Sequence, residues 1–192
     1  MNNLTDQELI AIHRGLCKVD ISISGLSNAL AKVEQELRQV AEPYRTTVIL
    51  RDLEELSYEE IAEVVREAVA LGISKVRITG GEPLVRKGVT ELVRMVAAIP
   101  GIRDFGLTTN GILLADQIDE LKAGGLRRIT VSLDTLRRDR FIALTRKDEL
   151  ARVHDGIAAA RRVFGGLKID TVVIKGVNDD ELADLLEYGR AV

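Results

Sequence analysis

Cysteine is nearly absent from this sequence: Cys17 is the only one among 192 residues. A single thiol can form no internal disulfide, and it cannot by itself hold an iron–sulfur cluster, which takes several thiolate ligands. The two histidines, His13 and His154, are equally isolated. Because no second ligand stands at a metal-binding spacing from either one, we interpret both as surface or packing residues. The sequence therefore predicts no metal ligands and no iron–sulfur cluster in this chain.

An excess of basic residues and long apolar runs are also missing. The formal net charge is -3, so nothing in the charge balance argues for a nucleic-acid partner or an anionic membrane surface. No apolar run approaches the roughly 18 to 20 residues that span a bilayer, and residues 1–8 are too polar to begin a signal peptide. We therefore expect a cytoplasmic protein with no membrane partner and no nucleic-acid partner.

Apolar residues recur three and four positions apart in the N-terminal part of the chain. They are Leu9, Ile12, Leu16, Val19, Ile23, Leu26, Leu30, Val33, Leu37 and Val40. This heptad spacing predicts a long helical segment over residues 1–42, beginning at a capping box of Thr5 and Glu8 and ending before Pro43. Because an apolar stripe of this length needs a partner, the pattern favours a coiled coil that makes the protein a homo-oligomer through Leu9–Val40.

The same pattern has two other interpretations. The segment could form a helical hairpin broken at Ser24 and Gly25, or one amphipathic helix that lies on its own domain. Residues 20–24 are weakly helical by composition, so they form the weakest part of the predicted helix. The number of chains in an assembly stays open.

From residue 43 onward, short β-rich runs alternate with amphipathic helical stretches. This is the rhythm of consecutive βα units around a parallel sheet. We therefore predict an α/β fold, a partial parallel (β/α) barrel of about five strands, over residues 43–192. The predicted strands are 46–50, 75–79, 105–108, 128–133 and 168–175. The first predicted helix starts at a capping box of Ser57 and Glu60 and stops at Gly72, and the later helices are 89–98, 113–123, 138–144, 150–163 and 180–190.

Glycines and small polar residues follow three of the predicted strands. The segments are Thr-Gly-Gly-Glu-Pro at 79–83, Thr-Thr-Asn-Gly at 108–111 and Ser-Leu-Asp at 132–134. Right-handed crossovers bring the C-terminal ends of parallel strands to one rim, where α/β sheets bind ligands. Paired glycines let the backbone approach a ligand, and Glu82 offers a carboxylate suited to an ammonium group. Each motif alone is more often an ordinary turn, but together they outline one pocket.

Five segments in this order resemble the radical-SAM superfamily and, within it, the GTP 3',8-cyclases of molybdenum cofactor biosynthesis. They are LSYEEI at 56–61, KVRITGGEPLVRK at 75–87, LTTNG at 107–111, VSLD at 131–134, and KIDTVV with GVNDDE over 168–181. The resemblance spans about residues 46–192. It implies that Gly80, Gly81 and Glu82 hold the methionyl end of S-adenosylmethionine and that Ser132 contacts the same cofactor.

The resemblance also implies a substrate site. Arg77, Thr108 and Lys168 match positions that hold GTP in the cyclases, and we add Lys75, which we expect at the same strand end. A triphosphate needs cations in a partly dehydrated cleft, with Arg as a fork and Lys as a point charge. The alternative is that Lys75 and Arg77 form surface ion pairs with the acidic helices.

The departures from the family pattern decide the functional prediction. The family carries three cysteines, as CxxxCxxC, between its first strand and first helix, whereas residues 48–58 contain none. The cyclases' second cluster belongs to a C-terminal region that we expect to be missing from a truncated chain.

We therefore predict a cyclase-like fragment or pseudoenzyme, with no catalytic residues, that binds GTP or S-adenosylmethionine without radical chemistry. The chain alone is not expected to be active unless a partner chain supplies the cluster. The alternative is a coiled-coil-driven assembly or interaction module with no retained ligand, either natural or an engineered chimera.

Overall fold

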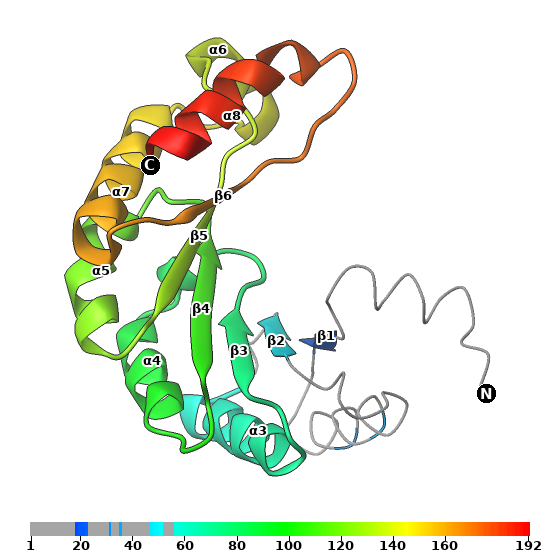
Figure 1. Cartoon of the computed structure of the whole chain (residues 1–192), viewed down its shortest axis with the longest axis vertical. Coiled ribbons are helices and arrows are strands. Elements are labelled where there is room, and N and C mark those ends of the chain that lie inside the picture. The colour runs from blue at the N-terminus through cyan, green and yellow to red at the C-terminus, as the bar shows by residue number, and fades with distance from the viewer. Residues whose placement is uncertain (1–17, 23–30, 32–34, 36–46, 52–55) are drawn as a thin grey trace. The chain divides into compact units, whose positions relative to one another are not determined.

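The computed structural model describes residues 18–22, 31, 35, 47–51 and 56–192 (Figure 1). The chain divides into two compact units. The first comprises Met1–Gly81 and Arg94–Phe105, and the second comprises Glu82–Val93 and Gly106–Val192. The division falls inside one helix, α4 (Val89–Ala97), and one strand, β4 (Asp104–Thr109).

The first unit contains three parallel strands. They are β1 (Lys18–Ser22), β2 (Thr47–Arg51) and β3 (Lys75–Ile78), and β2 pairs with both of the others. The helix α3 (Tyr58–Ala70) connects β2 to β3. Its predicted start is confirmed, because the Ser57 hydroxyl accepts from the Glu60 N–H at 3.2 Å while the Glu60 carboxylate accepts from the Ser57 N–H at 2.8 Å. This capping box satisfies two of the backbone donors that a helix start leaves unpaired.

The strand β1 interrupts the long N-terminal helix that the sequence predicts. Lys18–Ser22 pair in parallel with Thr47–Arg51. The β-branched Val19 and Ile21 favour a strand, and β1 reaches into the weakly helical 20–24 stretch. Residues 31 and 35 are helical. The rest of the heptad segment, including its capping box and Cys17, lies outside the described residues, so the coiled coil, the homo-oligomer and the 1–42 boundary stay predictions.

The second unit is built on the end of β4 and on β5 (Arg128–Ser132) and β6 (Lys168–Asp170). The three strands are parallel, with β5 paired to both neighbours. The elements between and after them are η2 (Pro83–Val85), α5 (Leu114–Ala123), α6 (Arg138–Thr145), α7 (Leu150–Phe164), η3 (Asp179–Glu181) and α8 (Leu182–Ala191). The helices match their predicted ranges within about two residues, the usual uncertainty of a helix end.

The core of the second unit lies between the sheet and the pair α5 and α7, which lie side by side along β4 and β5 (Figure 1). Leu107 and Val131 on the strands, and Ile118 and Val153 on the helices, are fully buried. Because side chains alternate between the two faces of a strand, the neighbours of Leu107 and Val131 in sequence belong to the opposite face. That opposite face carries the polar residues of the candidate site.

The strand β6 is shorter than predicted, ending at Asp170 instead of continuing to Lys175. After Asp170, hydrogen bonds that involve side chains replace the backbone hydrogen bonds of the strand pair. The Thr171 hydroxyl donates to the Leu133 carbonyl at 2.6 Å, and the Val172 N–H donates to the Asp134 carboxylate at 2.8 Å. Local side-chain hydrogen bonds of this kind compete with a strand ladder, which explains the early end of β6.

The α/β class and the parallel arrangement of the strands are as predicted, and they are consistent with a partial (β/α) barrel. In the part of the chain that the structure describes, no helix is both long enough and apolar enough to cross a membrane.

Candidate functional site

The turn after β3 contains two glycines in the left-handed region. Gly80 has φ +92° and Gly81 has φ +43°. A Cβ built on Gly81 would have no atom within 4 Å. The position therefore needs glycine for its backbone conformation rather than for lack of room, and it leaves open space beside the main chain that a ligand could approach.

The Glu82 carboxylate is hydrogen-bonded to other residues of the second unit. Its Oε1 accepts from the Thr109 hydroxyl at 2.7 Å and from the Leu84 N–H at 3.0 Å, and its Oε2 accepts from the Asn110 N–H at 2.6 Å. The sequence predicted a carboxylate held ready for an ammonium group. The structure shows a partly buried carboxylate that ties the start of η2 to the end of β4, with lone-pair capacity left for one more donor.

Thr108, Ser132 and Lys168 lie on the same face of the β4–β5–β6 sheet. In the register, Thr108 is opposite Thr130, and Thr130 is opposite Lys168. Ser132 stands two residues beyond Thr130 on β5 and therefore faces the same side. We call Thr108, Thr130, Ser132, Lys168 and Asp170 the polar face. It brings together three of the eight predicted site residues within one unit.

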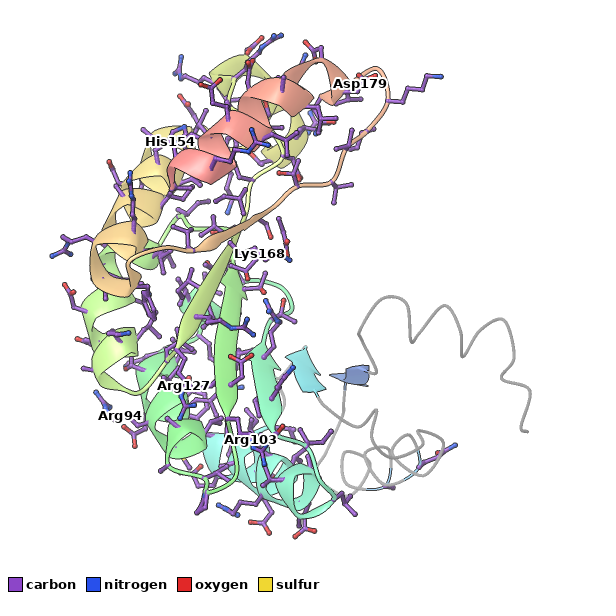
Figure 2. The ribbon with its side chains drawn as sticks, in the orientation of Figure 1. Arg94, Arg103, Arg127, His154, Lys168 and Asp179 are labelled. Carbon is purple, nitrogen blue, oxygen red and sulfur yellow. The ribbon has the colours of Figure 1, made fainter. Side chains whose placement is uncertain are left out.

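The two ends of the polar face differ in how they are bonded. The Lys168 ammonium forms an ion pair with the Asp170 carboxylate at 2.5 Å, and their side chains are 65% and 45% exposed. Figure 2 shows Lys168 projecting from β6. Ser132 is exposed, and its hydroxyl has no hydrogen-bond partner among the described residues. Ser132 is thus open to a ligand, whereas an anion at Lys168 would compete with Asp170.

The structure corrects the position of Lys75. It is the first residue of β3, paired with Thr47 at the start of β2, and so it lies at the strand end away from Gly80 and Gly81. Arg77 follows two residues later on the same face, while Val76 and Ile78 on the other face are buried. Lys168 also begins its strand, but the stagger of β6 places it opposite the middle of β5.

Two residues of the GVNDDE segment, to which sequence reasoning gave no role, hold the loop after β5. The Asn178 amide nitrogen donates to the Asp134 carbonyl at 2.7 Å and to the Val172 carbonyl at 2.9 Å. The Glu181 carboxylate accepts from the Thr135 hydroxyl at 2.6 Å and from the Leu136 N–H at 2.8 Å. Both Asn178 and Glu181 are fully buried. We call these two side chains the polar clamp; Asp179, labelled in Figure 2, lies between them in sequence.

Glu181 is held in its charged form. Burial alone would raise the pKa of its carboxyl, but hydrogen bonds from Thr135, Leu136 and Arg140, with the positive charge of Arg140, outweigh burial and lower the pKa. Arg140 also pairs with Asp180, and its hydrogen bond lowers the pKa of that exposed carboxyl. From sequence alone, an acidic residue in an Asp-Asp-Glu run is expected to be exposed to solvent. The resemblance of the GVNDDE segment to the family pattern was the one sequence feature that could have indicated a structural role for Glu181.

Two grooves lie in the second unit. One of about 510 Å³ runs between β6 and α8, and it is lined by Ile169, Thr171 and Val173 together with Lys168 of the polar face. The other, of about 470 Å³, lies between α7 and α8. There the Tyr188 hydroxyl and His154 Nδ1 are 2.8 Å apart, and burial raises the pKa of Tyr188. His154 is thus a packing residue, as predicted.

Comparison with known proteins agrees with the resemblance seen in the sequence. The model of the Radical SAM superfamily matches residues 43–189. A GTP 3',8-cyclase of Geobacter sulfurreducens is 54% identical over 130 residues, covering 67% of this chain and 40% of that protein. GTP 3',8-cyclase 1 of Mycobacterium tuberculosis is 51% identical over 142 residues, covering 71% and 40%.

The chain therefore belongs to the radical SAM superfamily. It spans about 40% of the length of the curated GTP 3',8-cyclases that it matches.

A cysteine-ligated iron–sulfur cluster does not fit the donors of this chain. The sequence has one cysteine, Cys17, whereas clusters of this kind are held by several thiolates. Among the described residues, no group of three or more His, Cys, Asp or Glu side chains could hold a metal ion. S-adenosylmethionine fits the donors of the second unit better, because the exposed Ser132 hydroxyl is suited to contact a ligand.

Proposed function

We propose that this chain binds GTP and S-adenosylmethionine as a relative of the GTP 3',8-cyclases of molybdenum cofactor biosynthesis, and that it performs no radical chemistry by itself. The observation that carries the proposal is the polar face, because Thr108, Ser132 and Lys168 share one side of one sheet. The helices α5 and α7 pack on the other side, so this side is where a ligand would be contacted.

The polar face has the chemistry of a phosphate contact at one end and of a hydroxyl contact at the other. Lys168 supplies a positive charge. Thr108 supplies a hydroxyl in the same row across the sheet, in which Thr108, Thr130 and Lys168 are opposite one another. Asp170 lowers the affinity of Lys168 for anions, because a phosphate must displace or repel its carboxylate. GTP binding is therefore expected in the micromolar to millimolar range, and it should weaken with added salt.

Within the second unit, the contacts to S-adenosylmethionine would come from Ser132 on the polar face and from Glu82. Glu82 keeps lone-pair capacity for the cofactor's ammonium group while its other bonds hold the turn. The cofactor's ordinary role is to deliver a radical after reduction by a cluster. Without cluster ligands, the residues of this chain would bind and orient the cofactor only.

Calorimetric titration with GTP at low ionic strength tests the nucleotide site. Lys168→Ala should weaken GTP binding about tenfold, the low end for a charge-assisted contact because the side chain is largely exposed. Asp170→Asn should act in the opposite direction and strengthen binding, since it removes the competing carboxylate. The matched control is Lys175→Ala, an exposed lysine beyond β6, which should leave the affinity unchanged. Guanosine should bind more weakly than GTP.

The outcome that overturns the GTP proposal is the absence of saturable heat with GTP, or equal affinity in the wild type and Lys168→Ala. A uniform loss in both lysine variants would also overturn it, because that pattern indicates attraction by net charge alone. S-adenosylmethionine is titrated separately, with Ser132→Ala as the variant. An unchanged affinity in Ser132→Ala would remove Ser132 from the cofactor site.

A further inference from the structure

Ser132 and Asp170 lie opposite each other on the polar face. They are partners in the parallel register of β5 and β6, so both side chains project from the same side of the sheet. The pairing is fixed just beyond them, because the Leu133 N–H donates to the Asp170 carbonyl at 2.9 Å and the Thr171 hydroxyl donates to the Leu133 carbonyl at 2.6 Å. Neighbouring strands lie about 5 Å apart, so a ligand group that contacts the Ser132 hydroxyl comes close to the Asp170 carboxylate.

The Asp170 carboxylate has bonding capacity left for a ligand. Its Oδ1 pairs with the Lys168 ammonium at 2.5 Å, and its Oδ2 accepts no hydrogen bond from the described residues. The side chain is 45% exposed, so a ligand can reach it. The Ser132 hydroxyl beside it has no partner among the described residues either. An unused acceptor and an unused hydroxyl therefore stand together on adjacent strands.

Asp170 controls the charge at this end of the polar face. Lys168 and Asp170 together are neutral. Without Asp170 a lone cation would remain, which favours anions, and without Lys168 a lone carboxylate would remain, which favours cations. GTP is a polyanion, whereas S-adenosylmethionine carries a positively charged sulfonium. The two proposed ligands should therefore respond to changes in this ion pair in opposite directions.

We propose that Asp170 is a specificity-determining residue for S-adenosylmethionine: its carboxylate, beside the Ser132 hydroxyl, favours a ligand with a positively charged sulfonium. This inference rests on the proposed cofactor contact at Ser132. Glu82 is assigned to the ammonium group of the cofactor, so the sulfonium is the positive charge left for Asp170. S-adenosylhomocysteine lacks the sulfonium methyl group and is neutral at sulfur, so it should bind more weakly.

The experiment titrates the full chain calorimetrically with S-adenosylmethionine and, separately, with S-adenosylhomocysteine at low ionic strength. The wild type should bind S-adenosylmethionine about three- to fivefold more tightly, a modest preference because the Asp170 carboxylate is partly exposed. In Asp170→Asn the preference should disappear, because the variant keeps the shape of the side chain and loses its charge. Asp170→Glu keeps the charge and should retain the preference.

Lys168→Ala is the reciprocal variant. It leaves the Asp170 carboxylate unpaired, so S-adenosylmethionine should bind about two- to fivefold more tightly while GTP binds more weakly. Asp170→Asn should do the reverse for both ligands, whereas a loss of general stability would weaken both. The control for net charge is Asp155→Asn, which should leave both affinities unchanged. Asp155 is exposed on α7, the helix that packs with α5 on the other side of the sheet.

The possible outcomes separate this inference from the proposed function. If the wild type binds S-adenosylmethionine and S-adenosylhomocysteine equally well, the role of Asp170 fails and the proposed cofactor binding stands. The role also fails if Asp170→Asn keeps the preference of the wild type, or if Asp170→Asn and Lys168→Ala shift the cofactor affinity in the same direction. If the wild type binds GTP but no S-adenosylmethionine, the contact at Ser132 and the role of Asp170 fail together.

Discussion

The helix α7 approaches the turn after β4 closely at Gly156, and this contact yields a sharp prediction. A Cβ at this position would lie 2.4 Å from the carbonyl oxygen of Gly111 and 3.1 Å from Leu114 Cβ. Gly111 belongs to that turn, where the Asn110 N–H donates to Glu82. The substitution Gly156→Ala therefore presses on the turn that Glu82 holds.

Two opposing effects decide the sign of the change. Inside a helix, alanine is favoured over glycine by up to about 1 kcal/mol. Against this, overpacking a buried site costs about 1 to 3 kcal/mol, and here the obstructing atom belongs to the backbone and cannot rotate away. We expect Gly156→Ala to lower the free energy of unfolding by about 1 to 2 kcal/mol net, which would lower Tm by roughly 2 to 8 °C for a chain of this size.

The control is Gly189→Ala in α8, where a Cβ would meet no atom within 4 Å. There only the helix propensity acts, so the free energy of unfolding should rise by a few tenths of a kcal/mol near the helix end. Urea unfolding followed by circular dichroism measures both variants. If Gly156→Ala proves as stable as the wild type, the close approach of α7 to the turn is wrong.

Two further predictions concern acid and iron. Because the folded-state pKa of Glu181 lies below its ordinary value of 4.5, the ionised carboxylate stabilises the fold fully above that pH, and this contribution is lost as the pH falls through the lower folded value. Urea unfolding between pH 7 and 3 should show less stability below about pH 4.5 in the wild type and a weaker pH dependence in Glu181→Gln. Anaerobic reconstitution with iron and sulfide should leave no stoichiometric cluster, and a reproducible visible absorption with about four irons per chain would contradict this.

Local signals in the sequence were sufficient for the helices of the α/β region. The capping box at Ser57 and Glu60 is bonded as expected, and Gly72 stands just past the end of α3 with φ +98°. Such features involve residues three or four positions apart, so they can be read without knowing the fold. The same holds for the apolar spacing of α7, whose buried positions include Val153 and Ile157.

The strand β1 and the early end of β6 could not be predicted from local pattern. In β1, Val19 satisfies a heptad as well as a strand, and the pairing with β2 decides between them. At β6, the run of residues 171–175 is β-rich by composition, but Asn178 bonds both the Val172 carbonyl and the Ile174 N–H. The formation of β1 and the end of β6 both depend on contacts with residues outside the local sequence window from which a strand is predicted.

The sequence named three residues of the polar face, Thr108, Ser132 and Lys168, but it could not give their bonding. Sequence spacing put Thr108, Ser132 and Lys168 near strand ends, and the register explains why they share a face. It could not reveal that Asp170 pairs with Lys168, or that Glu82 is bonded to the end of β4. A bonding partner that is distant in sequence, or that is one of several acidic residues nearby, can be identified only from the three-dimensional structure.

The supports of the second unit's site are all internal to that unit. The strand register places Thr108 and Lys168, the Glu82 bonds fix the turn after β4, and Glu181 fixes the loop after Ser132. None of these bonds uses a cysteine or the segment in which the family carries its cysteine motif. Loss of that motif would therefore abolish reduction of the cofactor while leaving these contacts their geometry. Ligand titration, rather than an activity assay, is therefore the measurement that tests the proposed binding.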